Sequence, residues 1–219
     1  MTFRHPRNEV LSRARTPEDK AKVREAIIAA GRKLFAEEED HSRISLRRIA
    51  AEAGYAPGSI YQYFAHQQDL FVQIRAHDMH KATEDLRHLI ARTRDPARRV
   101  EKLFIGAADY WLDHMDEFLM IFPAASTRAA PAPAGSQPFG QSPVVMESLA
   151  LYYETVEGLW ATLPSPPMPA RLAADMLIAA VHGTIVFPCM TRTMEWSDTR
   201  LMVTKLVTTI VRQWTSHRE

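Results

Sequence analysis

The chain has 219 residues, of which 46% are hydrophobic and 24% charged, an ordinary globular composition that excludes wholesale disorder and, with only 8 glycines, favours helices over strands. Its single cysteine, Cys189, excludes an intramolecular disulfide, and no uninterrupted apolar run of about 18 residues indicates a membrane span. The basic residues 1–10 lack the apolar stretch of a secretory signal, so a cytoplasmic protein is expected, and the net formal charge of +1 does not by itself indicate a nucleic-acid partner.

The beginning of the chain predicts a loose arm followed by a helix. Residues 1–16 are polar and basic, and we expect them to form a flexible arm. Thr16 followed by Pro17 is typical of a helix start, because the hydroxyl caps free backbone N–H groups and proline suits the first helical position. The spacing of apolar residues then predicts a helix to about residue 36.

Two short helices are predicted next. Ser45 begins the first of them, and Gly54 ends it, with a positive φ angle. Pro57 suits the first position of the second short helix, which should run through Phe64. Basic charge is concentrated in this part of the chain, since residues 1–66 contain 12 Lys and Arg against 9 acidic residues, whereas residues 67–219 contain 15 against 17. That asymmetry is modest but suits a phosphate-binding surface.

The remainder of the chain predicts six more helices and two proline-rich interruptions. The first interruption, residues 123–143, has five prolines and predicts a long irregular loop, which either covers the mouth of a pocket or is a passive insertion. The second, residues 164–169, has four prolines and should stop a helix. No window alternates as a strand, so we expect an all-α fold with about nine helices. The six predicted ranges are 67–94, 96 to about 114, 118–122, 144–163, 170–193 and 197–216, of which 118–122 is either a short helix or an apolar turn.

The two short helices and the glycine turn between them have the plan of a helix-turn-helix. Ile49 and Ala50 of the first should pack against Ile60 and Phe64 of the second. A solvated helix face normally shows Lys and Glu, whereas the outward face here offers hydroxyls and an amide, which bind phosphate oxygens and read base edges. The residues of that face are Pro57, Gly58, Ser59, Tyr61, Gln62 and Tyr63.

This stretch resembles the signature of the TetR family of transcription regulators over roughly residues 20–72. The matching segments are Leu46-Arg47-Arg48-Ile49-Ala50, Ala53-Gly54 and Gly58-Ser59-Ile60-Tyr61-Gln62-Tyr63-Phe64, with Phe35 in the preceding helix. The resemblance implies a helix-turn-helix DNA-binding domain at residues 17–66 and a helical ligand-binding and dimerisation domain at residues 67–219. It further implies a homodimeric repressor that releases a palindromic operator when a small hydrophobic or amphipathic effector binds.

The resemblance also implies the residues that contact DNA. They are Ser45, Arg47, Arg48, Pro57, Gly58, Ser59, Tyr61, Gln62, Tyr63, His66 and Gln67. The chain departs from the family pattern at Ala56, where a capping serine is usual, and at Gln67, where a phosphate-binding lysine is usual; His66 partly substitutes for it. We therefore expect weaker or more pH-dependent non-specific DNA binding. The basic arm, with Arg4, His5, Arg7, Arg13 and Arg15, either follows the DNA backbone or is a solubilising tail.

The last two predicted helices are unusually apolar. The helix at 170–193 is apolar nearly all round, which predicts burial on most sides, and the final helix carries an apolar stripe that ends at Trp214. Such a pair favours a four-helix bundle between two copies of the chain, and the family resemblance implies the same; the alternative is that both helices form the core of a monomer. A two-fold operator favours the dimer, because it needs two recognition helices about 34 Å apart.

Large, soft side chains of the second half predict an effector pocket. The candidate ligand-binding residues are Trp111, His114, Met115, Phe118, Phe122, Tyr152, Tyr153, Trp160, Met176, His182 and Phe187. The alternative for each is an ordinary place in the core. His182 is a lone imidazole in an apolar helix and either donates to an effector or bonds a neighbouring carbonyl group. The long helix at 67–94 is the expected lever that transmits effector binding to the DNA-binding heads.

Two other classes of protein are alternatives, an enzyme and a helical small-molecule-binding protein without DNA binding. The sequence has no phosphate-binding glycine loop, no Gly-x-Ser-x-Gly and no His-Glu-x-x-His, so we expect neither enzymatic activity nor a cofactor. His77, Asp78, His80 and Glu84 share a helix, but no second cluster completes a metal site, and no bound metal is expected. A plain small-molecule carrier would leave the Tyr61 surface unexplained.

Overall fold

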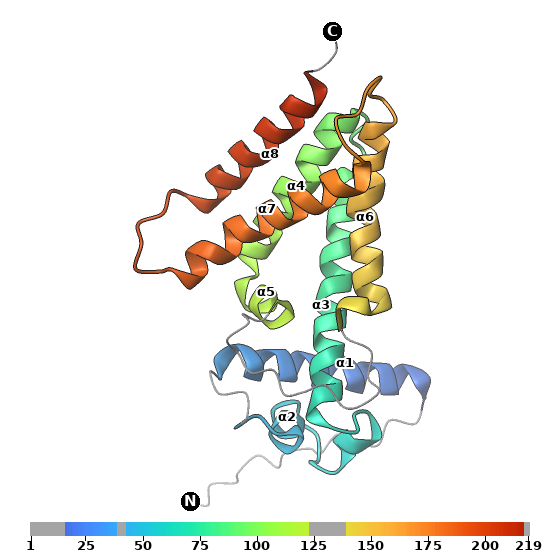
Figure 1. The fold of residues 1–219 in the computed structure, drawn as a ribbon. Helices are drawn as coiled ribbons and strands as arrows, with labels where there is room; N and C mark the ends of the chain where they lie inside the picture. Colours follow the sequence, from blue (N-terminus) through green and yellow to red (C-terminus); the bar gives the residue numbers. More distant parts are fainter. Residues whose placement is uncertain (1–15, 39–42, 123–138, 217–219) are drawn as a thin grey trace, which may run out of the picture. The chain divides into compact units, whose positions relative to one another are not determined.

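A computed structural model describes residues 16–38, 43–122 and 139–216 (Figure 1). The described residues form eight α-helices and two short 3-10 helices and contain no strand, which confirms the predicted all-α class. The elements are α1 (Pro17–Glu37), α2 (Leu46–Glu52), η2 (Ser59–Gln62), α3 (Gln67–Ile90), α4 (Pro96–Asp113), α5 (Met115–Ile121), η3 (Phe139–Gln141), α6 (Pro143–Trp160), α7 (Ala170–Met190) and α8 (Thr199–Thr215). The predicted arm, apart from Thr16, and the loop residues 123–138 lie outside the described residues.

The chain divides into two compact units, of which the first ends at His77 and the second begins at Asp78. The helix α3 contributes its first residues to the first unit and the remainder to the second. Each unit has apolar side chains buried among its own helices, and the two are described separately below.

Local capping chemistry sets the helix starts of the first unit. Thr16 accepts a hydrogen bond from the Asp19 backbone N–H (3.1 Å), and Asp19 accepts one from the Thr16 N–H (3.4 Å), so a full capping box begins α1. Ser45 caps α2 in the same way, accepting from the Arg48 N–H at 3.2 Å. Gly54 then ends that region with φ of 79°, as predicted, a conformation that residues with a Cβ rarely adopt.

The third predicted helix differs from its expectation, because residues 57–64 contain one 3-10 turn, η2, in place of an α-helix. Gly58 at its start supplies no side-chain cap. The Ser59 hydroxyl donates instead to the Ala56 carbonyl oxygen (2.7 Å), a local bond that competes with helix formation. Ile60 and Phe64 are nevertheless buried, and η2 packs against α2, so the helix-turn-helix plan holds with a shortened second element.

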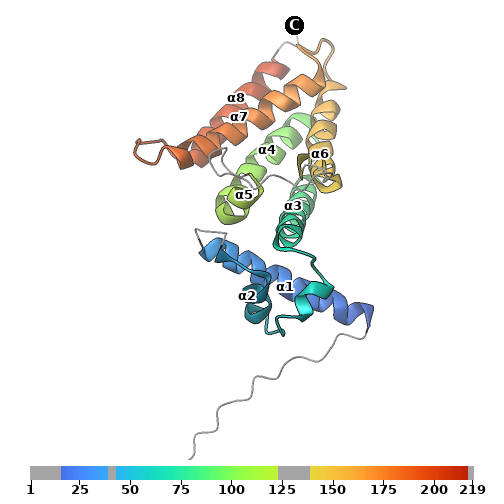
Figure 2. The same ribbon diagram turned by 60° about the horizontal axis from the view of Figure 1, so that its bottom comes forward.

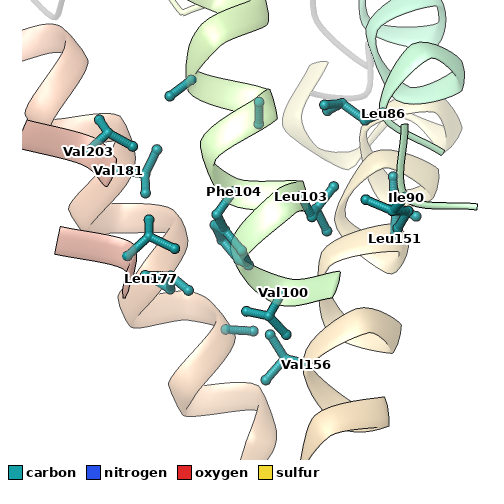
Figure 3. Packing of buried hydrophobic residues seen from close by; sticks show 14 of the residues in the cluster. Leu86, Ile90, Val100, Leu103, Phe104, Leu151, Val156, Leu177, Val181 and Val203 are labelled. Carbon is teal, nitrogen blue, oxygen red and sulfur yellow. The ribbon is translucent and has the colours of Figure 1, made fainter. Parts of the chain in front are cut away.

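The second unit is built around α4, which packs against α6, α7 and α8. Figure 3 shows Val100, Leu103 and Phe104 of α4 pointing into a shared apolar core. The opposing side chains come from four helices; those labelled are Leu86 and Ile90 of α3, Leu151 and Val156 of α6, Leu177 and Val181 of α7, and Val203 of α8. Proline at the first position begins both α4 and α6, and Asp95 caps α4 by accepting from the Arg98 N–H (2.7 Å).

The helix α7 is less buried than its composition predicts. It lies beside α8 in both ribbon views (Figures 1 and 2), and its inner face reaches the core. An outer stripe of large apolar side chains stays exposed within one chain, at Leu172, Met176, Phe187 and Met190. Among the described residues, α7 is also the helix that is long and apolar enough to cross a membrane by length and composition alone. Burial on most sides was therefore a wrong prediction for a single chain, because α4, α6 and α8 cover only part of the helix.

Candidate nucleic-acid interface

The outward face of η2 carries the predicted DNA-binding side chains. Tyr61 is 53% exposed, Gln62 is exposed, and Tyr63 is half-buried. Ile60 and Phe64, which flank these three residues, have no more than 1% of their surface exposed. One short segment thus buries its apolar side chains in the core and leaves two phenols and an amide at the surface, where a duplex could contact them.

Around this face, the turn residues Pro57 and Gly58 are exposed, and Ser59 is half-buried with its hydroxyl already bonded to Ala56. His66 is exposed and Gln67 half-buried, where α3 begins. The structure therefore brings the predicted residues 57–67 together on one continuous segment of surface.

The two arginines of α2 have different surroundings, although both are exposed. The Arg48 guanidinium forms an ion pair with Glu38 at the end of α1, with 2.9 Å between Nη1 and Oε2. Arg47 makes no ion pair with any residue in the described part of the chain, so its five N–H donors are available to a ligand. Ser45, also predicted to contact DNA, uses its hydroxyl oxygen to cap α2.

A second ion pair joins α1 and α2. Lys33 lies 2.6 Å from Glu52, and this hydrogen bond raises the pKa of Lys33 above its ordinary value. Together with Arg48 and Glu38, it links the long supporting helix to the first helix of the motif at two points. Such exposed pairs contribute little to the free energy of folding.

A series of linked hydrogen bonds connects the segment that follows η2 to α3 and α1. The Ala65 N–H donates to Asp69 (3.3 Å), and the other Asp69 oxygen accepts from the Gln73 amide nitrogen (3.1 Å). The Gln73 amide oxygen accepts in turn from the Arg24 guanidinium of α1. The Arg24 guanidinium also lies over the Phe64 ring, 5.4 Å from its centroid. Arg24 therefore connects α1 to both sides of the turn between η2 and α3.

A groove of about 380 Å³ lies between α1 and η2. Its lining residues are Lys20, Ala21, Arg24, Gln62 and Tyr63. Sequence reasoning singled out Gln62 and Tyr63 but missed Lys20 and Arg24. Their spacing of four residues, which places two cations on one face of α1, was the signal available in the sequence.

Four of the predicted ligand-binding residues form one aromatic cluster inside the second unit. His182 of α7 contacts Phe118 and Phe122, with ring centroids 4.9 and 4.3 Å apart, and Trp111 lies 5.9 Å from Phe118. Burial among these rings lowers the pKa of His182 below its ordinary value of 6.5, because the charged imidazolium loses hydration there. This cluster joins α4, α5 and α7.

His114 and Met115 are half-buried where α4 gives way to α5. The His114 ring stacks on Tyr110, with centroids 4.3 Å apart, and its Nδ1 lies 2.8 Å from the Tyr110 carbonyl oxygen. Both residues are thus close in sequence to Trp111 and Phe118, but His114 already has a local partner.

The remaining predicted ligand-binding residues lie in other surroundings. Trp160 donates to the Met168 carbonyl oxygen (2.7 Å) and packs on Trp214, while Tyr153 donates to Asp175 (2.8 Å). Tyr152 packs on Phe104, and burial raises its pKa. Met176 and Phe187 belong to the exposed stripe of α7. The structure therefore gathers part of the predicted set into one cluster and distributes the rest.

The residues considered for a metal site pair with other groups. His77 lies 3.8 Å from Glu25, His80 lies 3.9 Å from Glu147, and Glu84 pairs with Arg87. Within the described ranges, no three His, Cys, Asp or Glu side chains gather as metal ligands would.

Comparison with known proteins agrees with this geometry. The family model described as bacterial regulatory proteins, tetR family, matches residues 27–74, whereas no curated protein sequence matches the chain. A protein of unknown function from Rhodococcus sp. RHA1 is 18% identical at a TM-score of 0.71, with 88% of this chain and 95% of that chain covered. The regulator FadR from Bacillus subtilis, solved in complex with stearoyl-CoA, is 18% identical at 0.67, with 85% and 97% covered.

A third similar structure is a transcriptional regulator of the TetR/AcrR family from Thermobifida fusca, 19% identical at a TM-score of 0.65, with 90% of this chain and all of that chain (100%) covered. Identities this low show a shared fold and no more. The family model, however, matches the residues that form α2, the glycine turn and η2, the segment whose outward face carries Tyr61 and Gln62. Over residues 27–74 the chain is therefore similar to the tetR family of bacterial regulatory proteins, and the described residues share the fold of solved TetR-type regulators.

Proposed function

We propose that this chain is a cytoplasmic, ligand-responsive repressor that binds a palindromic operator as a homodimer and releases it when a hydrophobic or amphipathic effector binds. The observation that carries the proposal is that residues 60–64 bury their apolar side chains, Ile60 and Phe64, and expose Tyr61 and Gln62. Enzymatic activity is not part of the proposal. The DNA-binding role is assigned to residues 17–66 and the effector-binding and dimerisation roles to residues 67–219.

Each exposed group of the interface receives a role that suits its chemistry. The Gln62 amide is the candidate for reading a base edge, because an amide can donate to and accept from one adenine at once. The Tyr61 hydroxyl and the Arg47 guanidinium are the candidates for phosphate contacts, which set register but carry no sequence information. Gly58 leaves room for close approach of the backbone to the duplex.

The exposed stripe of α7 supports the homodimer. A monomer would leave Leu172, Met176, Phe187 and Met190 in water, and pairing with the same stripe of a second copy would bury all four around a two-fold axis. Two further residues extend the exposed apolar surface: Met194, between α7 and α8, and Leu201, near the start of α8.

The aromatic cluster supports an effector that is largely apolar with one polar group. Trp111, Phe118 and Phe122 offer apolar surface, and His182 offers a neutral imidazole that hydrogen-bonds a polar group. The complex of the Bacillus subtilis FadR with stearoyl-CoA belongs to that protein, and it makes long-chain acyl compounds a reasonable first class to test here.

The decisive experiment is selection of binding sites from a random double-stranded DNA library by the full chain. We expect enrichment of an inverted repeat. Arg47→Ala should then weaken binding to the selected duplex by about 1–3 kcal/mol, roughly 5- to 160-fold, because a phosphate or base contact is lost. Binding is measured by fluorescence anisotropy at fixed salt, with unchanged oligomeric state by light scattering.

The control for this variant is Lys22→Ala, which removes a cation from an exposed position of α1 outside the interface. It should leave affinity for the selected duplex unchanged. A library that yields no enriched sequence would contradict the proposed function, and a selected duplex that binds Arg47→Ala as tightly as the wild type would remove Arg47 from the interface.

A further inference from the structure

We infer that the groove between α1 and η2 holds a backbone phosphate of the bound duplex, gripped by Lys20 and Arg24. This inference rests on the proposed DNA binding but adds a contact from α1, a helix outside the helix-turn-helix. The groove has a volume of about 380 Å³ and is lined by two cations, one methyl group, one amide and one phenol, with no acidic side chain among them.

The two cations lie on one face of α1, four residues apart, which places them as neighbours on the helix surface. Lys20 is exposed and makes no ion pair with any residue of the described ranges. Its ammonium group has three donors and no acceptor, so an anion is the ligand that satisfies it. The next lysine, Lys22, points away from this face because it is only two residues farther along the helix.

Arg24 is held in place before any ligand arrives. Its guanidinium donates to the Gln73 amide oxygen and lies over the Phe64 ring, and both partners are tied to the turn that follows η2. One of the five guanidinium N–H groups is used by Gln73, so the remaining donors are available to a second acceptor. An arginine fixed in this way loses little conformational freedom when it binds a phosphate.

The opposite wall of the groove identifies the phosphate as one of DNA. Gln62 and Tyr63 line the groove, and Gln62 at the same time belongs to the exposed face of η2 that is proposed to read bases. A duplex that presents a base edge to Gln62 therefore carries its own backbone next to the two cations. The first three residues of α3, Gln67, Gln68 and Asp69, include no cation that could bind a phosphate in the same way.

The test compares two variants with the same change of charge, Lys20→Gln and Lys22→Gln, on the selected duplex and on a scrambled duplex. Each phosphate contact contributes about 0.9 to the slope of log affinity against log salt, and a dimer has two copies of the groove. We expect Lys20→Gln to lower the slope by about 1.8, to weaken binding to both duplexes by the same factor, and to leave folding intact. Lys22→Gln should keep the wild-type slope.

Equal slopes for Lys20→Gln and the wild type would overturn the inference while leaving the proposed function in place, since selection of an operator does not depend on Lys20. Titration of inorganic phosphate into the free protein is the second arm. Phosphate binding that requires Lys20, together with an unchanged slope on DNA, would assign the groove to a free anion and equally overturn the DNA contact.

Discussion

At the scale of single residues, two glycines of the helix-turn-helix differ in whether the backbone conformation requires glycine. Gly54 ends α2 with φ of 79°, whereas Gly58 begins η2 with φ of −78°. Neither position would bring an added Cβ within 4 Å of another group. The difference between them is therefore purely one of backbone conformation.

This difference predicts opposite effects of alanine. Gly54→Ala should lower the free energy of unfolding by about 1–2 kcal/mol, because a Cβ is strained in the left-handed region. Gly58→Ala should raise the free energy of unfolding by about 0.4–1 kcal/mol, because alanine lowers the conformational entropy of the unfolded chain. Urea unfolding of both variants measures this, and equal changes in the two would contradict the assigned conformations.

His182 provides a second prediction, concerning pH. Its pKa is lowered by burial, so below about pH 6.5 the unfolded chain takes up a proton that the folded chain takes up only at lower pH. The contribution of the neutral imidazole to stability is therefore complete above pH 6.5 and is lost as the pH falls. We expect the wild type to lose more stability than His182→Gln between pH 7.5 and about 5.5.

The measurement is urea unfolding of both proteins across that range, because other titrating groups cancel in the difference. His88→Gln, at an exposed position of α3, is the matched control for the same change of side chain. A difference between the wild type and His182→Gln that does not vary with pH would contradict the buried environment of this imidazole.

At the scale of elements, the starts of helices were predictable because their causes are local. Thr16, Ser45 and Asp95 each cap a helix with a side chain that lies within three residues of its partner. The conformation of residues 57–64 was not predicted from the same signals, because Pro57 favours a helix start whereas the Ser59 hydroxyl bonds the Ala56 carbonyl oxygen and Gly58 supplies no cap. The link from Arg24 to Gln73 joins residues 49 positions apart, a distance at which no sequence period gives information.

The candidate site shows the same division. Its exposed side chains, among them Tyr61 and Gln62, followed from the pattern of apolar residues around them. The ion pair of Arg48 with Glu38 could not be predicted, because it depends on how α1 packs against α2. The spacing of Lys20 and Arg24 places both on one face of α1, but the sequence does not show that this face lies beside η2. The predicted effector residues do not all lie in one cluster for the same reason, since aromatic composition does not specify which helix face each ring occupies.

At the scale of the whole molecule, the proposed dimer predicts a sharp effect of one charge. Met176 on α7 and Met146 on α6 have nearly the same exposure, 51% and 53%. Met176→Glu places a carboxylate in the centre of the proposed interface, where it would be desolvated without a partner, and should give a monomer with strongly weakened binding to the selected duplex. Met146→Glu should remain dimeric and bind as the wild type does.

Light scattering at micromolar concentration, followed by anisotropy with the selected duplex, measures both properties. Dimeric Met176→Glu would contradict pairing through α7. Dissociation of both variants would show that the interface extends to α6, and that result would also contradict the arrangement proposed here.

Arg48 already has a carboxylate partner before a duplex arrives. The Glu38 carboxylate, with Oε2 2.9 Å from Nη1, already balances the charge of this guanidinium and uses one of its donors. An approaching backbone must displace this internal competitor, so Arg48 adds little attraction toward arbitrary sequence. For the proposed regulator, whose operators would be vastly outnumbered by mismatched sites, this self-neutralisation would lower the share of molecules bound to the wrong sites.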